Sequence, residues 1–320
     1  MKSLKSNKKQ IFLVLVLVCF GVVVSIFFTK IEQKRAPSEK EKTEFAKSGV
    51  KTKSPNRIIC AAPSVVEIVF ALGCGDQVVG ISHFSKYIPE TKTKANIGGL
   101  INPNKELIIA LQPDLLITQG KHESLEKLCR EKDIQFITLT IETLEDITKV
   151  IAFLGEELDA EDQAKRIIKK INSELAEVKA RTMDIQKRKT FLVIGHTPGS
   201  LSGIMTTGSR TFLNELIDIS GGKNIFSDTS RKYPQISKEA IIKREPDIII
   251  EVFPGGLSPE KKKLLYEDWK KLFSLTSLEK KHIHLLTEDY LLIPGIRVAQ
   301  TAEEFTQIIH PELYNEQNNH

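Results

Sequence analysis

A thirteen-residue motif that occurs twice constrains the fold more than any other feature of the chain. Residues 105–117 read KELIIALQPDLLI and residues 238–250 read KEAIIKREPDIII, so seven of thirteen positions are identical at an offset of 133. Each copy has a helix-start signal, Asn102 with Pro103 in the first and Ser237 in the second. A Pro-Asp turn and an apolar run follow in both copies. This repeated helix–turn–strand unit predicts two related α/β lobes.

Short apolar runs on either side of the repeat are expected to be strands. Several of them are continuous Ile, Leu and Val runs without alternation, which indicates strands covered on both faces, as in parallel sheets. The expected strands are residues 58–61, 78–82, 115–118, 136–139, 191–195, 248–252 and 283–286.

One long helix is expected between the two groups of strands, over about residues 160–187. This segment contains neither Gly nor Pro, and one apolar stripe follows its length at three- and four-residue steps. The stripe consists of Ala164, Ile168, Ile171, Leu175 and Val178. The predicted fold class is therefore α/β, with two lobes that each hold a mostly parallel sheet and are joined by a single long helix.

The N-terminal region is expected to anchor the chain to a membrane. Residues 11–28 form an uncharged apolar run of eighteen residues after several lysines. As a helix, the run would span about 27 Å, close to the thickness of a bilayer core. The lysines place the N-terminal end in the cytoplasm and the body outside, and the lack of a small-x-small cleavage site favours an uncleaved anchor over residues 1–29. A cleaved signal peptide remains the alternative, and the bulky residues before Cys19 disfavour lipidation there.

The remaining boundaries follow from composition. Residues 30–55 are polar and Lys-rich, which predicts a disordered tether, with order beginning at Arg57. The expected parts are then a first lobe over 56–158, the joining helix over 159–188 and a second lobe over 189–315. The net charge of +5 arises in the first 55 residues, which hold twelve basic and four acidic groups. The body is mildly acidic, so a nucleic-acid partner is not expected.

Five segments in order resemble the cobalamin and iron–siderophore binding proteins of ABC importers, the helical-backbone class of periplasmic binding proteins. The resemblance covers about residues 57–312. The segments are RIICAAPSVVEIVFALGCGDQVVGIS, IGGLINPNKELIIALQPDLLI, TTGSRTFLNELIDISGGKNIFSD, YPQISKEAIIKREPDIII and TEDYLLIPGIRVAQTAEEFTQIIHPE. It implies a ligand cleft between the lobes, a monomeric body, and a permease with its ATPase as partners. It also implies a protein that binds a metal chelate, without catalysis and without a cofactor of its own.

The resemblance also assigns roles to particular residues. In cobalamin binders one Glu per lobe docks onto permease arginines, and Glu106 and Glu239 match those positions. A solvated Glu that only compensates a helix dipole is the alternative for each. Phe84 and Tyr233 stand where aromatic ligand contacts are expected, and Asp289 with Arg297 matches a polar pair near the cleft. The full set of expected ligand-binding residues is Phe84, His83, Leu100, His196, Ser200, Tyr233, Asp289, Tyr290 and Arg297.

The ligand is expected to be cobalamin or a related corrinoid. Leu100 and Ser200 replace aromatic residues of cobalamin binders, so a ferric siderophore or haem remains the alternative. A membrane-tethered sensor or scavenger without a permease is the second alternative. His83 lies beside Phe84, and His196 ends a strand where α/β folds bind ligands. The only tryptophan, Trp269, is expected in a charged surface helix.

Catalytic, metal and disulfide alternatives are weaker. His196 and Ser200 could act as base and nucleophile, but no G-x-S-x-G elbow and no P-loop is present in the sequence. His282 and His284 share a strand face but lack a third ligand, so no metal site is expected. The body cysteines, Cys60, Cys74 and Cys129, are expected to be buried thiols, with a Cys60–Cys74 disulfide as the alternative.

Overall fold

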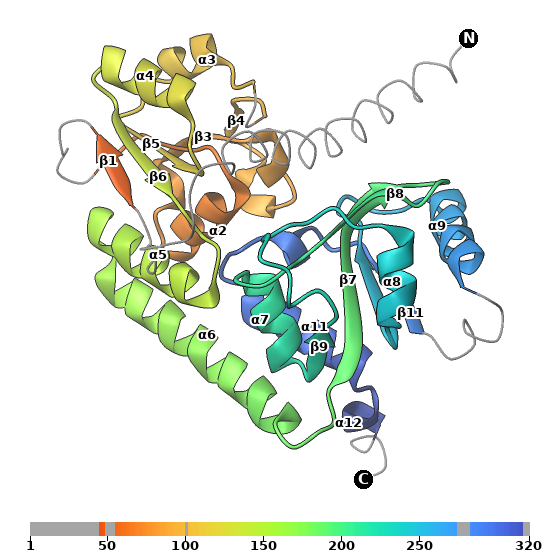
Figure 1. The fold of residues 1–320 in the computed structure, drawn as a ribbon. Coiled ribbons are helices and arrows are strands. Elements are labelled where there is room, and N and C mark those ends of the chain that lie inside the picture. Colours follow the sequence, from red (N-terminus) through yellow and green to blue (C-terminus); the bar gives the residue numbers. More distant parts are fainter. Residues whose placement is uncertain (1–44, 49–54, 100–101, 274–281, 316–320) are drawn as a thin grey trace, which may run out of the picture. The chain divides into compact units, whose positions relative to one another are not determined.

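The computed structural model describes residues 45–48, 55–99, 102–273 and 282–315 and divides them between two compact units (Figure 1). The N-terminal unit comprises Lys42–Asp184 together with Asp289–Gln307. The C-terminal unit takes Ile185–Glu288 and Ile308–His320. The segment 289–307 therefore groups with the first unit, although its place in the sequence had put it in the second lobe. Each unit is described by itself.

The N-terminal unit is built on a six-stranded sheet with the order β1-β6-β5-β2-β3-β4. All neighbouring strands are parallel except the edge pair of β1 and β6. The strands are β1 (Ala46–Ser48), β2 (Ile58–Cys60), β3 (Val78–Ile81), β4 (Ala95–Asn96), β5 (Leu115–Gln119) and β6 (Gln135–Leu139). The helices are α2 (Pro63–Ala71), η1 (Gly75–Gln77), η2 (His83–Ser85), η3 (Pro89–Thr91), α3 (Lys105–Ala110), α4 (Glu123–Glu131), α5 (Leu144–Glu157) and α6 (Glu161–Thr182), with η4 (Asp289–Leu292) and α11 (Val298–Ile309) later in the chain.

Helices cover both faces of this sheet, which explains why its central strands are mostly apolar without alternation. The three residues of β2 are all fully buried. One face packs against α3 and α4 through Ile59, Ile108 and Leu125, which belong to one core cluster. The other face meets α2, which contacts β2, β5 and α5. The prediction of parallel, doubly covered strands is confirmed.

Helix α6 confirms the predicted long helix, with bounds five residues shorter at its end. Its apolar stripe is buried except for the half-buried Ile168, and α6 packs along α5. The two helices approach so closely that a Cβ on Gly155 of α5 would lie 2.5 Å from the Cβ of Ala164. Only glycine permits this spacing. An Arg181–Glu303 pair, with Nη1 and Oε1 3.1 Å apart, connects α6 to α11.

The C-terminal unit holds a five-stranded sheet with the order β11-β10-β7-β8, and β9 pairs with β7. Only the β7–β8 pair is antiparallel. Its core cluster gathers Phe191, Phe226 and Trp269 among aliphatic side chains. The elements are β7 (Arg188–Thr197), β8 (Ser202–Thr206), α7 (Phe212–Ile219), β9 (Gly222–Asn224), α8 (Lys238–Arg244), β10 (Ile248–Val252), α9 (Pro259–Leu272), β11 (His282–Leu286) and α12 (Glu312–Asn315).

The sequence repeat is a structural repeat. Helices α3 and α8 begin with side-chain caps at equivalent places, because Asn104 Oδ1 accepts from the Leu107 N–H at 2.9 Å and Ser237 Oγ accepts from the Ala240 N–H at 3.3 Å. The expected first cap was Asn102, so the start signal was two residues too early. Ser237 is confirmed. Both caps satisfy a backbone donor in the first turn of the helix.

The helix ends of the two copies also correspond. Gln112 (φ +46°) and Glu245 (φ +49°) both adopt the left-handed conformation directly before a proline, which stops the helix. The residue after the proline, Asp114 or Asp247, accepts a backbone N–H at the start of the neighbouring strand. The donors are Arg57, just before β2, at 3.0 Å and Lys189, the second residue of β7, at 2.9 Å. The two units thus share one helix–turn–strand geometry.

Part of the predicted tether is ordered. Residues 46–48 form β1, which adds to the free edge of β6. The Phe45 ring stacks on Phe153 of α5 with centroids 4.5 Å apart, and Lys47 Nζ lies 2.7 Å from Glu157 Oε2. An aromatic side chain and an unpaired sheet edge outweigh the polar composition of this stretch. The predicted anchor, residues 1–29, lies outside the described residues.

Two further predictions, for Trp269 and for the body cysteines, concern residues that lie in the cores. Trp269 is fully buried, so its expected place on the surface is wrong. Helix α9 is rich in charged residues, yet the face that carries Leu265 and Trp269 packs into the core. The three body cysteines are buried free thiols, and no Cys60–Cys74 disulfide forms. Burial raises the pKa of Cys60, and it raises the pKa of Cys129 to about 12.

We predict that Phe45→Ala destabilises the N-terminal unit by about 1–3 kcal/mol, because it removes a ring stack and partly buried apolar area. Urea unfolding followed by circular dichroism measures this change. The matched control is Lys47→Ala, which breaks a partly exposed ion pair of the same strand and should cost less than about 1 kcal/mol. Equal effects of the two changes would contradict the role given to Phe45.

Candidate functional site

Ligands of open α/β sheets bind outside the carboxyl ends of the strands, and in the N-terminal unit that edge carries His83 and Phe84. Both lie in η2, directly after β3. The backbone N–H of His83 donates to Gly98 O at 2.8 Å, and its Nδ1 lies 3.2 Å from Asn96 Nδ2. Phe84 is half-buried, and its ring meets the His83 ring edge-on with centroids 5.8 Å apart. Phe84 therefore retains an accessible face and is not part of the buried core.

A buried carboxylate lies behind this edge. Glu67 of α2 has a side chain that is 4% exposed, and Arg297 Nη2 lies 2.5 Å from its Oε1. The Tyr87 hydroxyl donates to the same oxygen at 2.5 Å. The Arg297 guanidinium also lies 4.1 Å from the ring centroid of Tyr290 and 5.3 Å from that of Tyr87. Arg297, expected to bind ligand, is thus held by a carboxylate and two aromatic rings.

The surroundings of Glu67 restrict the chain around it. A Cβ on Gly295 would lie 2.5 Å from Glu67 Oε2, so a larger residue there would force the buried Glu67 carboxylate to move. That same oxygen is buried and has no hydrogen-bond partner among the described residues. Burial, and then the adjacent Glu67 carboxylate, raise the pKa of Tyr87, so its hydroxyl stays protonated and donates. The cluster of Glu67, Tyr87, Tyr290 and Arg297 joins α2, the loop after β3 and the segment 289–307.

A second buried polar cluster lies at the carboxyl end of β7 in the C-terminal unit. His196 Nδ1 lies 2.6 Å from Glu251 Oε1, and its Nε2 lies 3.5 Å from Asp268 Oδ2. These are close contacts and not aligned hydrogen bonds, because neither ring nitrogen meets a partner at hydrogen-bond geometry among the described residues. Trp269 Nε1 donates to Glu251 Oε2 at 2.8 Å. Asp268 Oδ2 accepts the Gly199 N–H at 2.5 Å, which fastens the β7–β8 loop.

The other predicted residues divide between the units. Ser200 is exposed in the β7–β8 loop, with its Oγ 2.7 Å from Ser202 Oγ. Tyr233 is half-buried beside β8, whose Thr206 N–H donates to Pro234 O at 3.1 Å. Asp289 is half-buried at the start of η4, and the neighbouring Tyr290 is buried. Leu100 lies outside the described residues.

Glu106 and Glu239 are both exposed in the first turns of α3 and α8. The Glu239 carboxylate accepts from its own backbone N–H and from the Ser237 hydroxyl, which lowers the pKa of Glu239. His282 and His284 lie on β11 with ring centroids 6.4 Å apart. Burial, and then His282, lower the pKa of His284. Over the described ranges, no group of three or more His, Cys, Asp or Glu residues could hold a metal ion.

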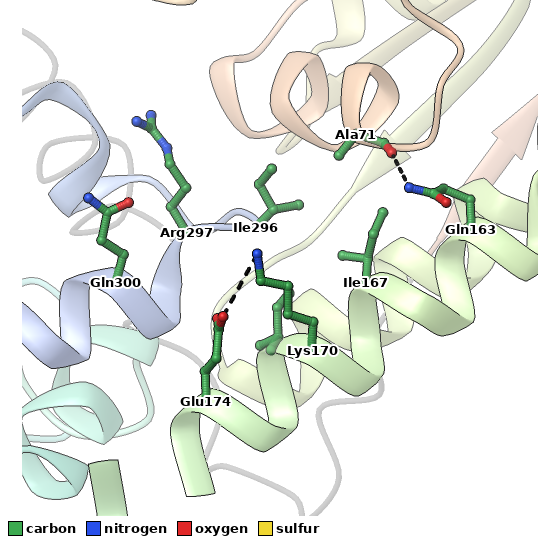
Figure 2. Close-up of a pocket in the computed structure, with 9 residues that line it drawn as sticks. Ala71, Gln163, Ile167, Lys170, Glu174, Ile296, Arg297 and Gln300 are labelled. Atoms are coloured by element: carbon green, nitrogen blue, oxygen red, sulfur yellow. Dashed lines mark hydrogen bonds and ion pairs between the residues drawn. The ribbon is translucent and has the colours of Figure 1, made fainter. Parts of the chain in front are cut away.

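A pocket of about 410 Å³ lies within the N-terminal unit among α6, the end of α2 and the start of α11 (Figure 2). Gln163 donates to the Ala71 carbonyl at 3.1 Å on one side, and Lys170 pairs with Glu174 at 3.8 Å on the other. Of the predicted ligand-binding residues, only Arg297 lines it. No residue of η2 lines the pocket, so it does not coincide with the strand-end edge that carries Phe84.

Comparison with known proteins decides the family. The profile of the family described as periplasmic binding protein matches residues 58–265, from the first central strand of the N-terminal unit into α9. The chain belongs to the periplasmic binding protein family.

Relatives of this periplasmic binding protein are similar over most of its length. An uncharacterized ABC transporter substrate-binding lipoprotein, YvrC of Bacillus subtilis, is 28% identical over 272 residues, which cover 82% of this chain and 83% of the relative. The vitamin B12-binding protein of Vibrio parahaemolyticus is 28% identical, and the match covers 79% of this chain and 90% of the relative. A periplasmic heme binding protein of Pseudomonas aeruginosa shares the fold with a TM-score of 0.70 at 21% identity, over 80% and 93% of the two chains. At the level of the family, these are binding proteins and not enzymes.

Sequence reasoning missed the partners that hold its candidate residues. Glu67, Tyr87, Glu251 and Asp268 were not singled out. A signal existed for two of them, because Glu67 interrupts the apolar run SVVEIVFAL and Glu251 interrupts IIIEVF. A charge within an apolar run is rarely buried unless it is paired.

In the described part of the periplasmic binding protein, no helix is long and apolar enough to cross a membrane.

We predict that Arg297→Ala destabilises the N-terminal unit by about 2–4 kcal/mol, because it leaves the Glu67 carboxylate buried and unpaired. The same change in a Glu67→Gln background should cost at least about 1 kcal/mol less, since no buried charge is then abandoned. Urea unfolding followed by circular dichroism measures both. The matched control is Arg181→Ala, which breaks a half-exposed Arg–Glu pair of the same unit and should cost less than about 1 kcal/mol. Additive costs in the double variant would contradict the pairing.

Proposed function

We propose that this chain is the extracytoplasmic substrate-binding protein of an ABC importer, which captures cobalamin or a related corrinoid and delivers it to a permease. The observation that carries the proposal is the likeness to the vitamin B12-binding protein over 79% of this chain. The family match is compatible with binding of cobalamin, a ferric siderophore or haem. It therefore supports the role in transport more strongly than the identity of the ligand.

The proposed ligand contacts come from both units. The N-terminal unit offers His83 and Phe84 at its strand-end edge, and the C-terminal unit offers Ser200 and Tyr233. Phe84 and Tyr233 are half-buried, as expected for aromatic rings whose remaining exposed surface could contact a ligand. Arg297 contributes in this proposal by its exposed edge only, because Glu67 and two rings hold its guanidinium. The contact proposed for Leu100 stays a prediction.

Two alternatives are kept. A ferric siderophore or haem is the alternative ligand, and the fold likeness to the heme binding protein of Pseudomonas aeruginosa supports keeping it. A tethered sensor or scavenger without a permease is the alternative role. The name of the Bacillus subtilis relative, which includes ABC transporter substrate-binding lipoprotein, supports the transport role and a body outside the cytoplasm. For this chain we propose that residues 1–29 serve as the membrane anchor.

Glu106 and Glu239 are proposed to dock onto basic residues of the permease, one from each unit. Their support is the structural equivalence of α3 and α8, which share capping, helix end and exposure. A carboxylate at the same exposed place in two related units suits a partner that presents two equivalent basic sites.

The ligand is identified by spectral titration of the purified protein with cobalamin, cobinamide, haem and a ferric siderophore. We expect saturation with a corrinoid, and Phe84→Ala or Tyr233→Ala should weaken it about five- to a hundredfold, the loss expected when an aromatic contact of about 1–3 kcal/mol is removed. The unfolding midpoint should change little, because neither ring is fully buried. Tyr266→Ala in α9 is the control and should leave affinity unchanged. Saturation by haem or siderophore alone would overturn the corrinoid assignment.

Charge reversal tests docking. The double variant Glu106→Lys/Glu239→Lys should abolish ligand uptake in cells that carry the permease and ATPase, while the affinity for ligand stays at the wild-type value. Each exposed ion pair contributes little alone, so single variants should lose much less than the double variant. The control Glu123→Lys/Glu260→Lys reverses two other acidic residues in first helical turns and should leave uptake intact. Normal uptake by the first double variant would contradict the docking role.

A further inference from the structure

Four large hydrophobic side chains are exposed in the part of the chain that the structure describes, and two of them occupy the same place in the repeat. Ile109 of α3 is 39% exposed and Ile242 of α8 is 48% exposed. Their positions differ by the repeat offset of 133 residues. The other two, Met183 and Leu264, lie outside the repeat. Single exposed hydrophobic residues are ordinary, but the same residue type at equivalent places in two units requires a common reason.

The isoleucines are not displaced members of the cores. In each helix the preceding residue, Ile108 or Ile241, faces inward and is fully buried. The exposure classes of residues 105–113 and 238–246 are the same at all nine positions. The outward isoleucine is therefore a property of the repeated geometry. Isoleucine is also a mediocre helix former, since its branched Cβ loses rotamer freedom, so local helix stability does not explain its choice.

Each exposed isoleucine shares a helix face with the acidic residue of its copy. Glu106 and Ile109 are three residues apart, as are Glu239 and Ile242, and residues at this spacing are neighbours on a helix surface. Each unit thus presents a carboxylate with an apolar side chain one turn further along. We name these pairs the α3 patch, Glu106 with Ile109, and the α8 patch, Glu239 with Ile242.

We propose that the α3 patch and the α8 patch are two equivalent docking epitopes for the permease, in which Ile109 and Ile242 enter apolar contacts beside the glutamate ion pairs. The inference rests on the proposed transport function. It adds an apolar contact to each of the ion pairs already proposed for docking. It commits to the chemistry of the partner, which must present a basic residue next to a small apolar surface at two equivalent places. Apolar contact supplies affinity that exposed ion pairs alone do not supply.

Charge argues against the other occupants. A symmetric dimer of this chain would bring the same patch together from both copies, so it would place two like carboxylates in one contact and supply no extra basic group to pair them. An anionic membrane surface would likewise repel both carboxylates. A basic partner surface is the one that matches both members of each patch.

The test measures binding of the full-length protein to its permease–ATPase complex in lipid nanodiscs. Ile109→Ser and Ile242→Ser should each weaken binding about three- to tenfold, and the double variant about ten- to a hundredfold, as expected for losing one or two buried apolar side chains. Met183→Ser, which removes the most exposed of the four hydrophobic side chains, is the matched control and should bind as the wild type does. Ligand affinity and unfolding midpoint should not change in any of them.

The outcomes separate this inference from the proposed function. If Glu106→Gln/Glu239→Gln weakens binding and the double isoleucine variant does not, docking stands and the apolar epitope is wrong. If the wild-type protein does not bind the complex at all, the transport function fails and the epitope with it. If the isoleucine variants change only the oligomeric state in size-exclusion chromatography, the patches serve self-association and the permease assignment is wrong.

Discussion

The parallel sheets depend on coverage from both sides, and much of the structure follows from that constraint. Strands β2 and β10 are buried at every position, so neither face of the sheet meets water at these central strands. Successive parallel strands must therefore be joined by a connection that returns across the sheet, and the repeated helix–turn–strand unit supplies such a connection in both units. The carboxyl ends of the strands, with the loops that follow them, are left to carry function.

Charges inside this apolar framework connect elements that the sheets do not join. Glu67 holds Arg297 and Tyr87, so the segment 289–307 is fastened to α2 although more than two hundred residues separate them in sequence. Glu251 and Asp268 hold His196 and the backbone of the β7–β8 loop in the other unit. Buried ion pairs add little to stability compared with apolar packing, but removing one partner is costly. Such pairs therefore favour one arrangement of the loops over others.

The duplicated helices, α3 and α8, match each other both on their buried faces and on their exposed faces. Their buried isoleucines complete two separate cores, whereas their exposed glutamates and isoleucines contribute nothing to either core. Core packing requires the inward pattern in any α/β repeat. It does not require matching side chains on the solvent face, and this is why the shared outward face bears on function.

The amino-acid sequence by itself determined the fold class, the positions of the seven predicted strands, the long helix and the repeat, because continuous apolar runs, helical periodicity and capping residues are local signals. The family resemblance rested on the same local segments. Tertiary structure alone decided that Phe45 and β1 extend a sheet edge, that Trp269 is buried, and that Asp289–Gln307 joins the N-terminal unit. It also decided that Arg297 is bound to Glu67. These outcomes depend on which distant side chains meet, and a buried charge finds its partner through the fold and not through spacing in the chain.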